Sequence, residues 1–512
     1  MLNLRDQQVL VLGLGESGLA MARWCARGGA RVRVWDSRES PPQAATLRAE
    51  LPAAALIGGA LGDEAMTGVQ RLLKSPGLAP SDPRIAAALA FAGAHGVPVE
   101  GELDLFVQAL DRLRIERDYA PQLLAITGTN GKTTTTAMTA LLVERAGRTV
   151  AMAGNIGPTL LDTLARVLDE ARLPQVWVLE LSSFQLDTVR GFEPNAAAVL
   201  NVTQDHLDWH GSMQSYAAAK ARVFGERGGA VVVVNRDDPI TEAMVPGLVA
   251  HKTAKGRAAK PRPRHVVRFG LDAPQRPGDF GLVTESGMAW LVRALDDEVG
   301  IKRRKDEPVE IHLQRLMPAD ALRLRGRHNA ANALAALALA TAIGCPLGPM
   351  LHGLREYGGE PHRVQPVGRI GEVEAFDDSK GTNVGATVAA LQGLGADRAP
   401  ARLAVILGGD GKGQDFSPLA APMQRHARAA ALIGRDAQAI ADVLSDTGVP
   451  LQRHDSLPQA VRWCFEQALP GDAVLLSPAC ASLDMFRNYG HRAEVFVQAV
   501  RELAAERGEL LL

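Results

Sequence analysis

Short apolar runs recur along the chain, separated by longer stretches of mixed apolar and polar residues. The runs are about four to eight residues long and cover residues 9–12, 123–127, 176–179, 197–200, 230–234, 403–407 and 473–477. They lack polar alternation, as do strands that helices cover on both faces of a parallel sheet. The pattern therefore predicts an α/β protein.

The length of the chain predicts more than one domain. A prior of roughly 150 residues per domain divides the 512 residues into three units. A charged stretch near residues 111–122 and a Gly- and Pro-rich stretch near 357–366 are the candidate boundaries. We expect domains at 1–115, 116–360 and 361–512. The charged, proline-containing segment of about 252–320 is predicted to be a solvated insertion, and we assign it no function.

Charge and cysteine content narrow the class of protein. The 56 Lys and Arg nearly balance the 57 Asp and Glu, which favours a small-molecule partner over nucleic acid. The four cysteines are far apart and form no CxxC pair, so neither a disulfide framework nor a zinc site is predicted. The N-terminal residues are typical of a first strand rather than a signal peptide, and no apolar run approaches the roughly 20 residues that span a bilayer. We expect a cytoplasmic protein without membrane insertion.

A glycine motif follows the first predicted strand. Gly13-Leu14-Gly15-Glu16-Ser17-Gly18 opens a predicted helix, and a second predicted strand ends at Asp36, as in a dinucleotide-binding fingerprint. Glycines at this place let the diphosphate of any nucleotide approach the N–H groups at the helix start. The motif alone leaves open a nicotinamide cofactor, another nucleotide ligand, or a tight strand-to-helix turn.

A second glycine motif indicates a nucleoside triphosphate. The sequence ITGTNGKTTTT, residues 126–136, lies between a predicted strand and a helix expected from about Thr133. Its amides can surround phosphate oxygens, Lys132 can neutralise them and Thr133 can bind Mg²⁺. Ile126 occupies the place of the first glycine of GxxxxGK[ST], so the match is imperfect. A lysine loop of this kind disfavours the nicotinamide alternative.

Polar residues follow the next two predicted strands. Glu180 ends the run 176–179, where a carboxylate could hold Mg²⁺ opposite Thr133. His206 follows the run 197–200, although a single loop histidine is more often packed or solvated. Lys220 lies on a predicted helix and, taken alone, is expected to be a surface lysine.

Three polar loops follow predicted strands of the last domain. They cover residues 377–383, 408–413 and 477–484. Because carboxyl ends of parallel strands meet at one edge, these loops are expected to share a crevice. Lys380 and Lys412 would suit an anionic substrate there. The alternative is that each loop is an ordinary Gly-rich turn.

Taken in order, these motifs resemble those of the Mur ligase family. The resemblance covers nearly the whole chain, through TGTNGKTT (127–134), GNIG (154–157), ELSSFQL (180–186), NVTQDHLD (201–208), GRHNAANALAA (326–336), PHR (361–363), DDSKGTN (377–383), GGDGKG (408–413) and SPACASLDMF (477–486). It implies a Rossmann-like N-terminal domain, a central P-loop-type ATPase domain and a Rossmann-like C-terminal α/β domain. It also implies an ATP-dependent ligase of peptidoglycan synthesis, acting through an acyl phosphate. The members most alike add D-glutamate to UDP-N-acetylmuramoyl-L-alanine.

The same resemblance implies roles for individual residues. ATP is expected at Gly128, Thr129, Asn130, Gly131, Lys132, Thr133, Thr134, Asn329, Asn332, Arg363, Asp378 and Lys380. The UDP-substrate is expected at Gly15, Glu16, Ser17, Ser37, Arg38, Ser75 and Gly77, with Asn155 and His206 nearer its reacting end. D-Glutamate is expected at Thr382, Lys412, Ser482, Leu483 and Tyr489. The ligases that add D-glutamate often have phenylalanine at the position of Tyr489.

The implied catalytic residues are Lys132, Glu180, His206 and Lys220. Two Mg²⁺ ions are expected, one at Thr133 and Glu180 and one near His206, with Lys220 carbamylated so that it becomes a metal ligand. A monomer is expected. The rival interpretations are a sister amide ligase for another amino acid, a folylpolyglutamate synthetase-like enzyme, a nucleotide-binding module without catalysis, and a nicotinamide dehydrogenase.

Overall fold

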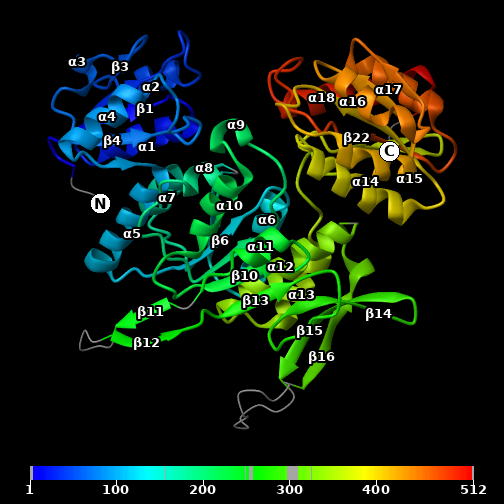
Figure 1. The fold of residues 1–512 in the computed structure, drawn as a ribbon, viewed down its shortest axis with the longest axis horizontal. Helices are drawn as coiled ribbons and strands as arrows, with labels where there is room; N and C mark the ends of the chain where they lie inside the picture. Colours follow the sequence, from blue (N-terminus) through cyan, green and yellow to red (C-terminus); the bar gives the residue numbers. More distant parts are fainter. Residues whose placement is uncertain are drawn as a thin grey trace.

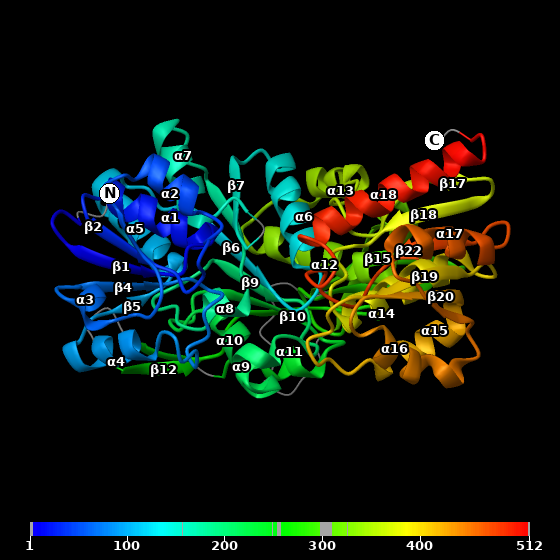
Figure 2. The same cartoon turned by 90° about the horizontal axis from the view of Figure 1, so that it is seen from above.

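The computed structural model describes residues 4–155, 157–247, 249–252, 258–296, 310–324 and 326–509. Its strands form three main sheets, each with helices packed against it, so the α/β class and the three domains are confirmed. The central domain lies between the other two, as both views show (Figure 1, Figure 2).

The N-terminal domain is a five-stranded parallel sheet in the order β3-β2-β1-β4-β5. Its strands are β1 (Gln8–Leu12), β2 (Arg31–Trp35), β3 (Ala55–Ile57), β4 (Arg71–Lys74) and β5 (Val99–Glu100). Its helices are α1 (Glu16–Arg27), α2 (Ala44–Glu50), α3 (Asp63–Met66), α4 (Ala86–His95) and α5 (Glu102–Arg117). The strand order reverses between β1 and β4, and ligands of open parallel sheets bind beyond the carboxyl ends of strands at such a point.

The central domain is built on a nine-stranded sheet in the order β16-β15-β14-β13-β10-β9-β6-β8-β7. The five strands that end this order are β6 (Gln122–Thr127), β7 (Val150–Gly154), β8 (Val176–Glu180), β9 (Ala196–Val199) and β10 (Val231–Asn235), with β7 at the edge. The helices are α6 (Lys132–Arg145), α7 (Leu160–Asp169), α8 (Ser183–Leu186), α9 (Leu207–His210), α10 (Met213–Ala221), α11 (Pro239–Ala243), α12 (Arg327–Ala342) and α13 (Leu347–Glu356). Because β6 pairs with both β8 and β9, the loops after these three strands are neighbours.

Both faces of the central sheet are covered. Along β6, Leu124 and Ile126 pack in the core that contains α6 and α12, whereas Ala125 packs in the core that contains α7. The core that contains α7 also includes buried residues of α1 and α5, so the N-terminal and central domains share apolar packing. Strands covered on both faces explain the continuous apolar runs of the sequence.

Part of the segment predicted to be a solvated insertion belongs to the central sheet. β13 (Val266–Phe269), β14 (Phe280–Glu285), β15 (Met288–Asp296) and β16 (Ile311–Pro318) extend it, and Phe269, Phe280 and Leu291 are buried. The prediction is wrong for these strands because apolar residues lie between the charged runs and are buried in one core with α12, which contacts β13 and β14. β11 (Val249–Lys252) and β12 (Ala258–Arg262) form a separate pair, and residues 253–257 and 297–309 lie outside the described residues.

The C-terminal domain has a six-stranded sheet in the order β17-β18-β22-β19-β20-β21. The strands are β17 (Gln365–Ile370), β18 (Val373–Asp377), β19 (Leu403–Gly408), β20 (Ala427–Ile433), β21 (Leu451–Arg453) and β22 (Ala473–Leu476). The helices are α14 (Val384–Arg398), α15 (Ala420–His426), α16 (Ala437–Leu444), α17 (Leu457–Gln467) and α18 (Tyr489–Glu506). Only β17 runs antiparallel to its neighbour, so the three predicted polar loops follow parallel strands.

Two further sequence expectations can be compared with the structure. All four cysteines, Cys25, Cys345, Cys464 and Cys480, are buried and free. None of the described helices combines the length and the apolar character that crossing a bilayer requires.

Candidate active site

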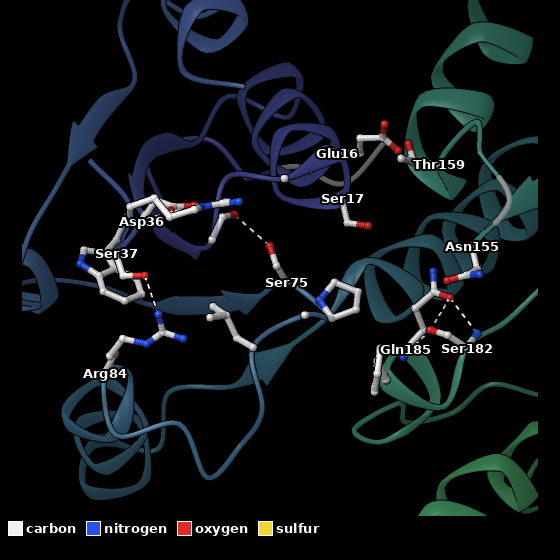
Figure 3. Close-up of a pocket in the computed structure, with 18 of the residues that line it drawn as sticks. Glu16, Ser17, Asp36, Ser37, Ser75, Arg84, Asn155, Thr159, Ser182 and Gln185 are labelled. Carbon is white, nitrogen blue, oxygen red and sulfur yellow. Dashed lines mark hydrogen bonds and ion pairs between the residues drawn. The ribbon is translucent and has the colours of Figure 1, made fainter. Parts of the chain in front are cut away.

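A cavity of about 560 Å³ lies beyond the carboxyl ends of β1, β2 and β4 and reaches the central domain (Figure 3). The predicted UDP-site residues that line it are Gly15, Glu16, Ser17, Ser37, Arg38, Ser75, Gly77 and Asn155. Gly13 and Pro76, which belong to the predicted glycine loop and to the predicted turn after β4, also line it. The lining residues that were not predicted for the site are Trp35, Asp36, Leu78, Arg84, Gly154, Thr159, Ser182, Phe184 and Gln185. Of the predicted set, only His206 is not among the lining residues.

The glycine loop after β1 is shaped by close backbone packing. A Cβ atom on Gly18 would lie 2.0 Å from the carbonyl oxygen of Gly13, so α1 can start this close to the strand only with glycine. The Ser75 hydroxyl donates to the same Gly13 oxygen at 2.9 Å. The loop after β4 is thereby held against the loop after β1, and both loops line the cavity.

Asp36 has an internal role beside this loop. Burial alone would raise its pKa, but hydrogen bonds from the Arg38 side chain and from the N–H groups of Leu14 and Arg38 lower that pKa to about 2. The carboxylate is 2% exposed, and both of its oxygens have protein partners. In a dinucleotide site this carboxylate would bind a ribose hydroxyl, so its engagement here disfavours the nicotinamide interpretation.

The phosphate loop connects β6 to α6, which begins at Lys132. Gly131 has φ +83°, and a Cβ atom there would lie 2.5 Å from the Asn332 side-chain oxygen. The Lys132 ammonium donates to the carbonyl oxygens of Gly128 and Thr129 at 3.0 and 2.8 Å. The loop is therefore a compact turn with its lysine folded over it, at the start of a helix that favours anions.

Lys220 lies beneath the phosphate loop, on α10. It is 1% exposed and donates to the Gly128 carbonyl oxygen at 2.9 Å, with its nitrogen 4.4 Å from the centre of the Tyr216 ring. Burial, and then the nearby Lys132 charge, hold the pKa of Lys220 well below its ordinary value. The surface position expected from the residue alone is wrong, because α10 packs this side chain under the loop.

Glu180 ends β8 next to the phosphate loop. Its carboxylate is 2% exposed, and one oxygen accepts a 2.9 Å hydrogen bond from the Asn155 amide. The other oxygen, Oε2, is buried and has no hydrogen-bond partner among the residues that the structure describes. Buried polar atoms are normally satisfied, and a carboxylate oxygen is a preferred ligand of Mg²⁺. The donor set therefore fits Mg²⁺, with the hydroxyl of Thr133, on the first turn of α6, as a second oxygen donor.

His206 precedes α9 with φ +54°. Its ring packs on Phe184, with ring centres 4.6 Å apart, and Nε2 lies 3.5 Å from the Asp205 carboxylate. Burial lowers its pKa, Asp205 opposes this, and Lys412, Lys132 and Lys220 add to the lowering. A neutral imidazole is the form that binds metals. His206 is not among the residues that line the large cavity, but Phe184, on which it packs, is.

A cleft of about 70 Å³ lies between the central and C-terminal domains. Predicted ATP-site residues on its wall are Asn130, Gly131, Thr134, Asn329, Asn332, Arg363 and Asp378. The remaining wall residues were not predicted and include Leu324, His328, Glu360, Val364, Ala386, Ala389 and Ala390. His328 lies within the GRHNAANALAA motif, but no motif marked the apolar positions among them, which can surround a flat base.

Three hydrogen bonds join the domains at this cleft. The Arg363 guanidinium donates to the Thr133 hydroxyl at 2.6 Å. The side-chain amides of Asn130 and Asn383 exchange two hydrogen bonds, at 3.2 and 3.1 Å. Asp378 is buried, which raises its pKa to about 7, and accepts a 2.6 Å hydrogen bond from Ser477. The phosphate loop thus contacts C-terminal residues directly.

Arg492 joins two of the three C-terminal loops. Its guanidinium is fully buried and donates to the Ser379 hydroxyl and carbonyl oxygens at 3.0 and 2.8 Å and to the Cys480 carbonyl oxygen at 3.1 Å. Asp410 and Ala481 exchange two backbone hydrogen bonds, which attach the remaining loop. The three loops therefore form one connected edge, as the strand ends predict.

The residues predicted for D-glutamate lie on this edge with different exposures. Ser482 is 4% exposed, whereas Leu483 is 73% and Tyr489 37% exposed. The Lys380 ammonium lies 4.9 Å from the centre of the Tyr489 ring. Thr382 follows β18 beside them, and Lys412 is close enough to His206 to influence its pKa.

Three family models match successive parts of the chain. They are "Mur ligase MurD-like, N-terminal domain" at residues 7–101, "Mur ligase middle domain" at 126–340 and "Mur ligase, glutamate ligase domain" at 362–480. A protein of Albidiferax ferrireducens named UDP-N-acetylmuramoylalanine--D-glutamate ligase is 61% identical over 507 residues, which are 99% of this chain and 98% of the relative. The chain belongs to the Mur ligase family.

Other Mur ligases support the same placement. A Burkholderia thailandensis protein with the same name is 57% identical and covers 98% of both chains. The structure of UDP-N-acetylmuramate-alanine ligase MurC from Thermotoga maritima matches with a TM-score of 0.57 at 19% identity, over 97% of this chain and 100% of the other. The structure of the MurF ligase from Thermotoga maritima in complex with ADP matches with a TM-score of 0.58 at 15% identity, over 98% of this chain and 96% of the other. These two structures support the Mur ligase fold.

Proposed function

We propose that this Mur ligase joins the amine of D-glutamate to the carboxylate of UDP-N-acetylmuramoyl-L-alanine, and that it converts ATP to ADP and phosphate. The observation that carries the proposal is the buried, unpartnered oxygen of Glu180. It lies beside the phosphate loop, and its carboxylate is bonded to Asn155, which lines the large cavity. Glu180 therefore lies between the large cavity and the phosphate loop, where its carboxylate could bind Mg²⁺ beside both the substrate carboxylate and the triphosphate. The names of the relatives support the choice of substrates.

The reaction has two balanced steps. An oxygen of the alanine carboxylate attacks the γ-phosphorus of ATP, the bond to the β-phosphate oxygen breaks, and ADP leaves. The amine of D-glutamate, after losing a proton, attacks the carbonyl carbon of this acyl phosphate, and phosphate leaves as the amide forms. A free carboxylate lacks such a leaving group, which is why phosphorylation precedes the amide bond.

The residues of the chain position the reactants and stabilise negative charge. Lys132 would turn from its loop carbonyls to the phosphate oxygens, and the amides of the loop from Gly128 to Thr134 would surround them. Arg363 and Lys380 would approach from the C-terminal domain. The polar edge around Lys412 and Ser482 would hold the carboxylates of D-glutamate. Charge in both transition states is spread over oxygens, so these fixed cations are the main contribution of the protein.

We assign Mg²⁺ to Glu180 and Thr133, and a second ion to the neighbourhood of His206. Bound there, Mg²⁺ would neutralise phosphate oxygens and fix their orientation. We also propose that Lys220 is carbamylated. The neutral amine, which its surroundings favour, is the form that reacts with carbon dioxide, and the product is an anionic ligand of the kind that Mg²⁺ prefers.

Phosphate release from ATP tests the proposal. The purified protein is given UDP-N-acetylmuramoyl-L-alanine and, in separate reactions, D-glutamate, L-glutamate, L-lysine or diaminopimelate. We expect release only with D-glutamate. Release that is indifferent to D-glutamate would refute the assignment, and release with diaminopimelate or L-lysine would indicate a sister ligase.

We further propose that the enzyme works as a monomer in the cytoplasm. ATP and free amino acids are substrates that the cytoplasm supplies.

A further inference from the structure

Two Asp-x-Arg sequences of the N-terminal domain adopt the same clamp. In Asp36-Ser37-Arg38, the aspartate accepts hydrogen bonds from the arginine N–H, Nε and Nη2 at 2.9, 2.8 and 2.7 Å. In Asp82-Pro83-Arg84 the same three bonds measure 2.9, 2.9 and 2.6 Å. Each carboxylate thus fixes one edge of a guanidinium and leaves the other edge available.

Both clamped guanidinium groups face the large cavity. Arg38 and Arg84 line it, with side chains 51% and 58% exposed. Nη1 of Arg84 is directed at the first clamp, because one of its two N–H groups donates to the Ser37 hydroxyl at 3.0 Å, and its second N–H can donate to a ligand (Figure 3). The two clamps, 46 residues apart when counted from Asp36 to Asp82, therefore meet at one end of the cavity.

The position of this end determines which part of a ligand it meets. The N–H groups that suit a diphosphate are those of the glycine loop at the start of α1. Asn155 and Ser182, which belong to the central domain, lie on the side of the cavity opposite Ser37 and Arg84 (Figure 3). A UDP-linked substrate that directs its reacting end to Asn155 would place its nucleoside beside Arg84.

The chemistry of the clamp suits a uracil ring. Uracil presents two carbonyl oxygens, on either side of an N–H group, as hydrogen-bond acceptors. A guanidinium with a fixed free edge can donate to such an oxygen, and the Ser37 hydroxyl can either donate or accept. In cytosine an amino group replaces one of these carbonyl oxygens, so a donor would face a donor and the hydrogen bond would be lost.

We propose that Arg84 is a specificity-determining residue that recognises the uracil base of the substrate. The inference rests on the proposed function, because that function supplies the uridine nucleotide. Asp82 has a positioning role, since it fixes the plane of the Arg84 guanidinium.

Binding measurements by calorimetry test the assignment with three probes: UDP, CDP and inorganic pyrophosphate. For the wild-type protein we expect UDP to bind more tightly than CDP. The Arg84→Ala variant should bind UDP about tenfold more weakly, the loss expected for one hydrogen bond from a charged donor, while its affinities for CDP and pyrophosphate stay the same. The ratio of UDP to CDP affinity therefore falls.

Arg84→Lys separates charge from geometry, and Arg112→Ala on α5, which is outside the cavity, is the matched control. We expect the lysine variant to lose the preference for UDP and the control to keep it. Equal losses for UDP and CDP, weaker pyrophosphate binding, or wild-type discrimination in Arg84→Lys would each overturn the assignment. Failure of the wild-type protein to bind UDP would instead refute the proposed function on which the assignment rests.

Discussion

Lys132 and Lys220 donate hydrogen bonds to the same acceptor, the carbonyl oxygen of Gly128, at 3.0 and 2.9 Å. Two ammonium groups this close to one atom repel each other, and burial of Lys220 increases the cost of its charge. A carbamate on Lys220 would replace this repulsion with an attraction to Lys132. The shared carbonyl is therefore the structural basis for expecting the modification.

Replacement of Lys220 should remove catalysis without removing the fold. We expect Lys220→Ala to lose at least about a hundredfold in kcat, because the anionic ligand that would hold Mg²⁺ beside the phosphates is absent. Excess bicarbonate should not restore activity, since alanine has no amine to modify. Full activity in this variant would exclude carbamylation from the mechanism.

The modification itself can be observed in the absence of substrates. Wild-type protein equilibrated with ¹³C-bicarbonate should show a carbamate carbon resonance by nuclear magnetic resonance. The same resonance should be missing from Lys220→Ala. A carbamate resonance that persists in the variant would locate the modification elsewhere.

Gly131 and Gly147 form a matched pair of sites for alanine. Both have φ +83°, but a Cβ atom on Gly131 would lie 2.5 Å from Asn332, whereas one on Gly147 meets no atom within 4 Å. Gly147→Ala should cost only the backbone strain, about 1 kcal/mol of unfolding free energy. Gly131→Ala should in addition distort the phosphate loop and reduce kcat/KM for ATP more than tenfold. Equal effects on ATP kinetics would contradict the role of the loop.

Arg492 should affect the C-terminal substrates and not the nucleotide cavity. Lysine cannot reproduce the fork that bonds Ser379 and Cys480 together, so buried oxygens would lose their partners. Arg492→Lys should raise KM several-fold for D-glutamate and ATP and leave UDP affinity unchanged. Arg501→Lys on the exposed face of α18 is the control. An unchanged KM for D-glutamate in Arg492→Lys would contradict this role.

Glu102 should make stability depend on pH. It lies at the start of α5 and accepts a hydrogen bond from the Leu161 N–H of the central domain at 3.0 Å. Burial raises its pKa from 4.5 to about 7, against the opposing hydrogen bonds, so the folded protein retains this proton more strongly than the unfolded chain. The stabilisation is complete below about pH 4.5 and is lost as the pH rises to about 7.

Glu102→Gln removes this loss because an amide keeps the acceptor without ionising. The melting temperature of the variant, relative to that of the wild-type protein, should therefore increase between pH 5 and pH 8. The corresponding full difference in the free energy of unfolding is on the order of 3 kcal/mol. Glu116→Gln, on the exposed end of the same helix, should show no such trend. A constant difference across this range would mean that Glu102 ionises normally in the folded protein.

Much of the fold follows from the apolar runs. Strands such as β6 and β19 begin and end within one residue of their predicted positions, because residues buried on both faces leave an unbroken pattern. β13 to β16 were missed because charged runs surround them, and because β15 and β16, which pair antiparallel at the end of the sheet, leave part of their residues exposed. Local composition does not show which apolar residues pack against α12.

The site could be predicted to a similar extent. Glycine loops and strand-end carboxylates are local features, and motif order supplied the rest. The burial of Lys220 depends on how α10 packs beneath a loop 92 positions earlier, which no local pattern contains. Arg84 was missed for the same reason, since its partner Ser37 is 47 positions away.

The most direct test of the central claim is mass spectrometry of the product formed in a mixture. The protein is given ATP, Mg²⁺ and UDP-N-acetylmuramoyl-L-alanine with equal amounts of D-glutamate, L-lysine and diaminopimelate. L-Glutamate, which has the same mass as D-glutamate, is tested in a separate reaction. We expect a single new UDP-linked species, heavier by one glutamate residue, formed with one ADP per product and absent with L-glutamate. A product that carries lysine or diaminopimelate, or ADP formation without an amide product, would contradict it.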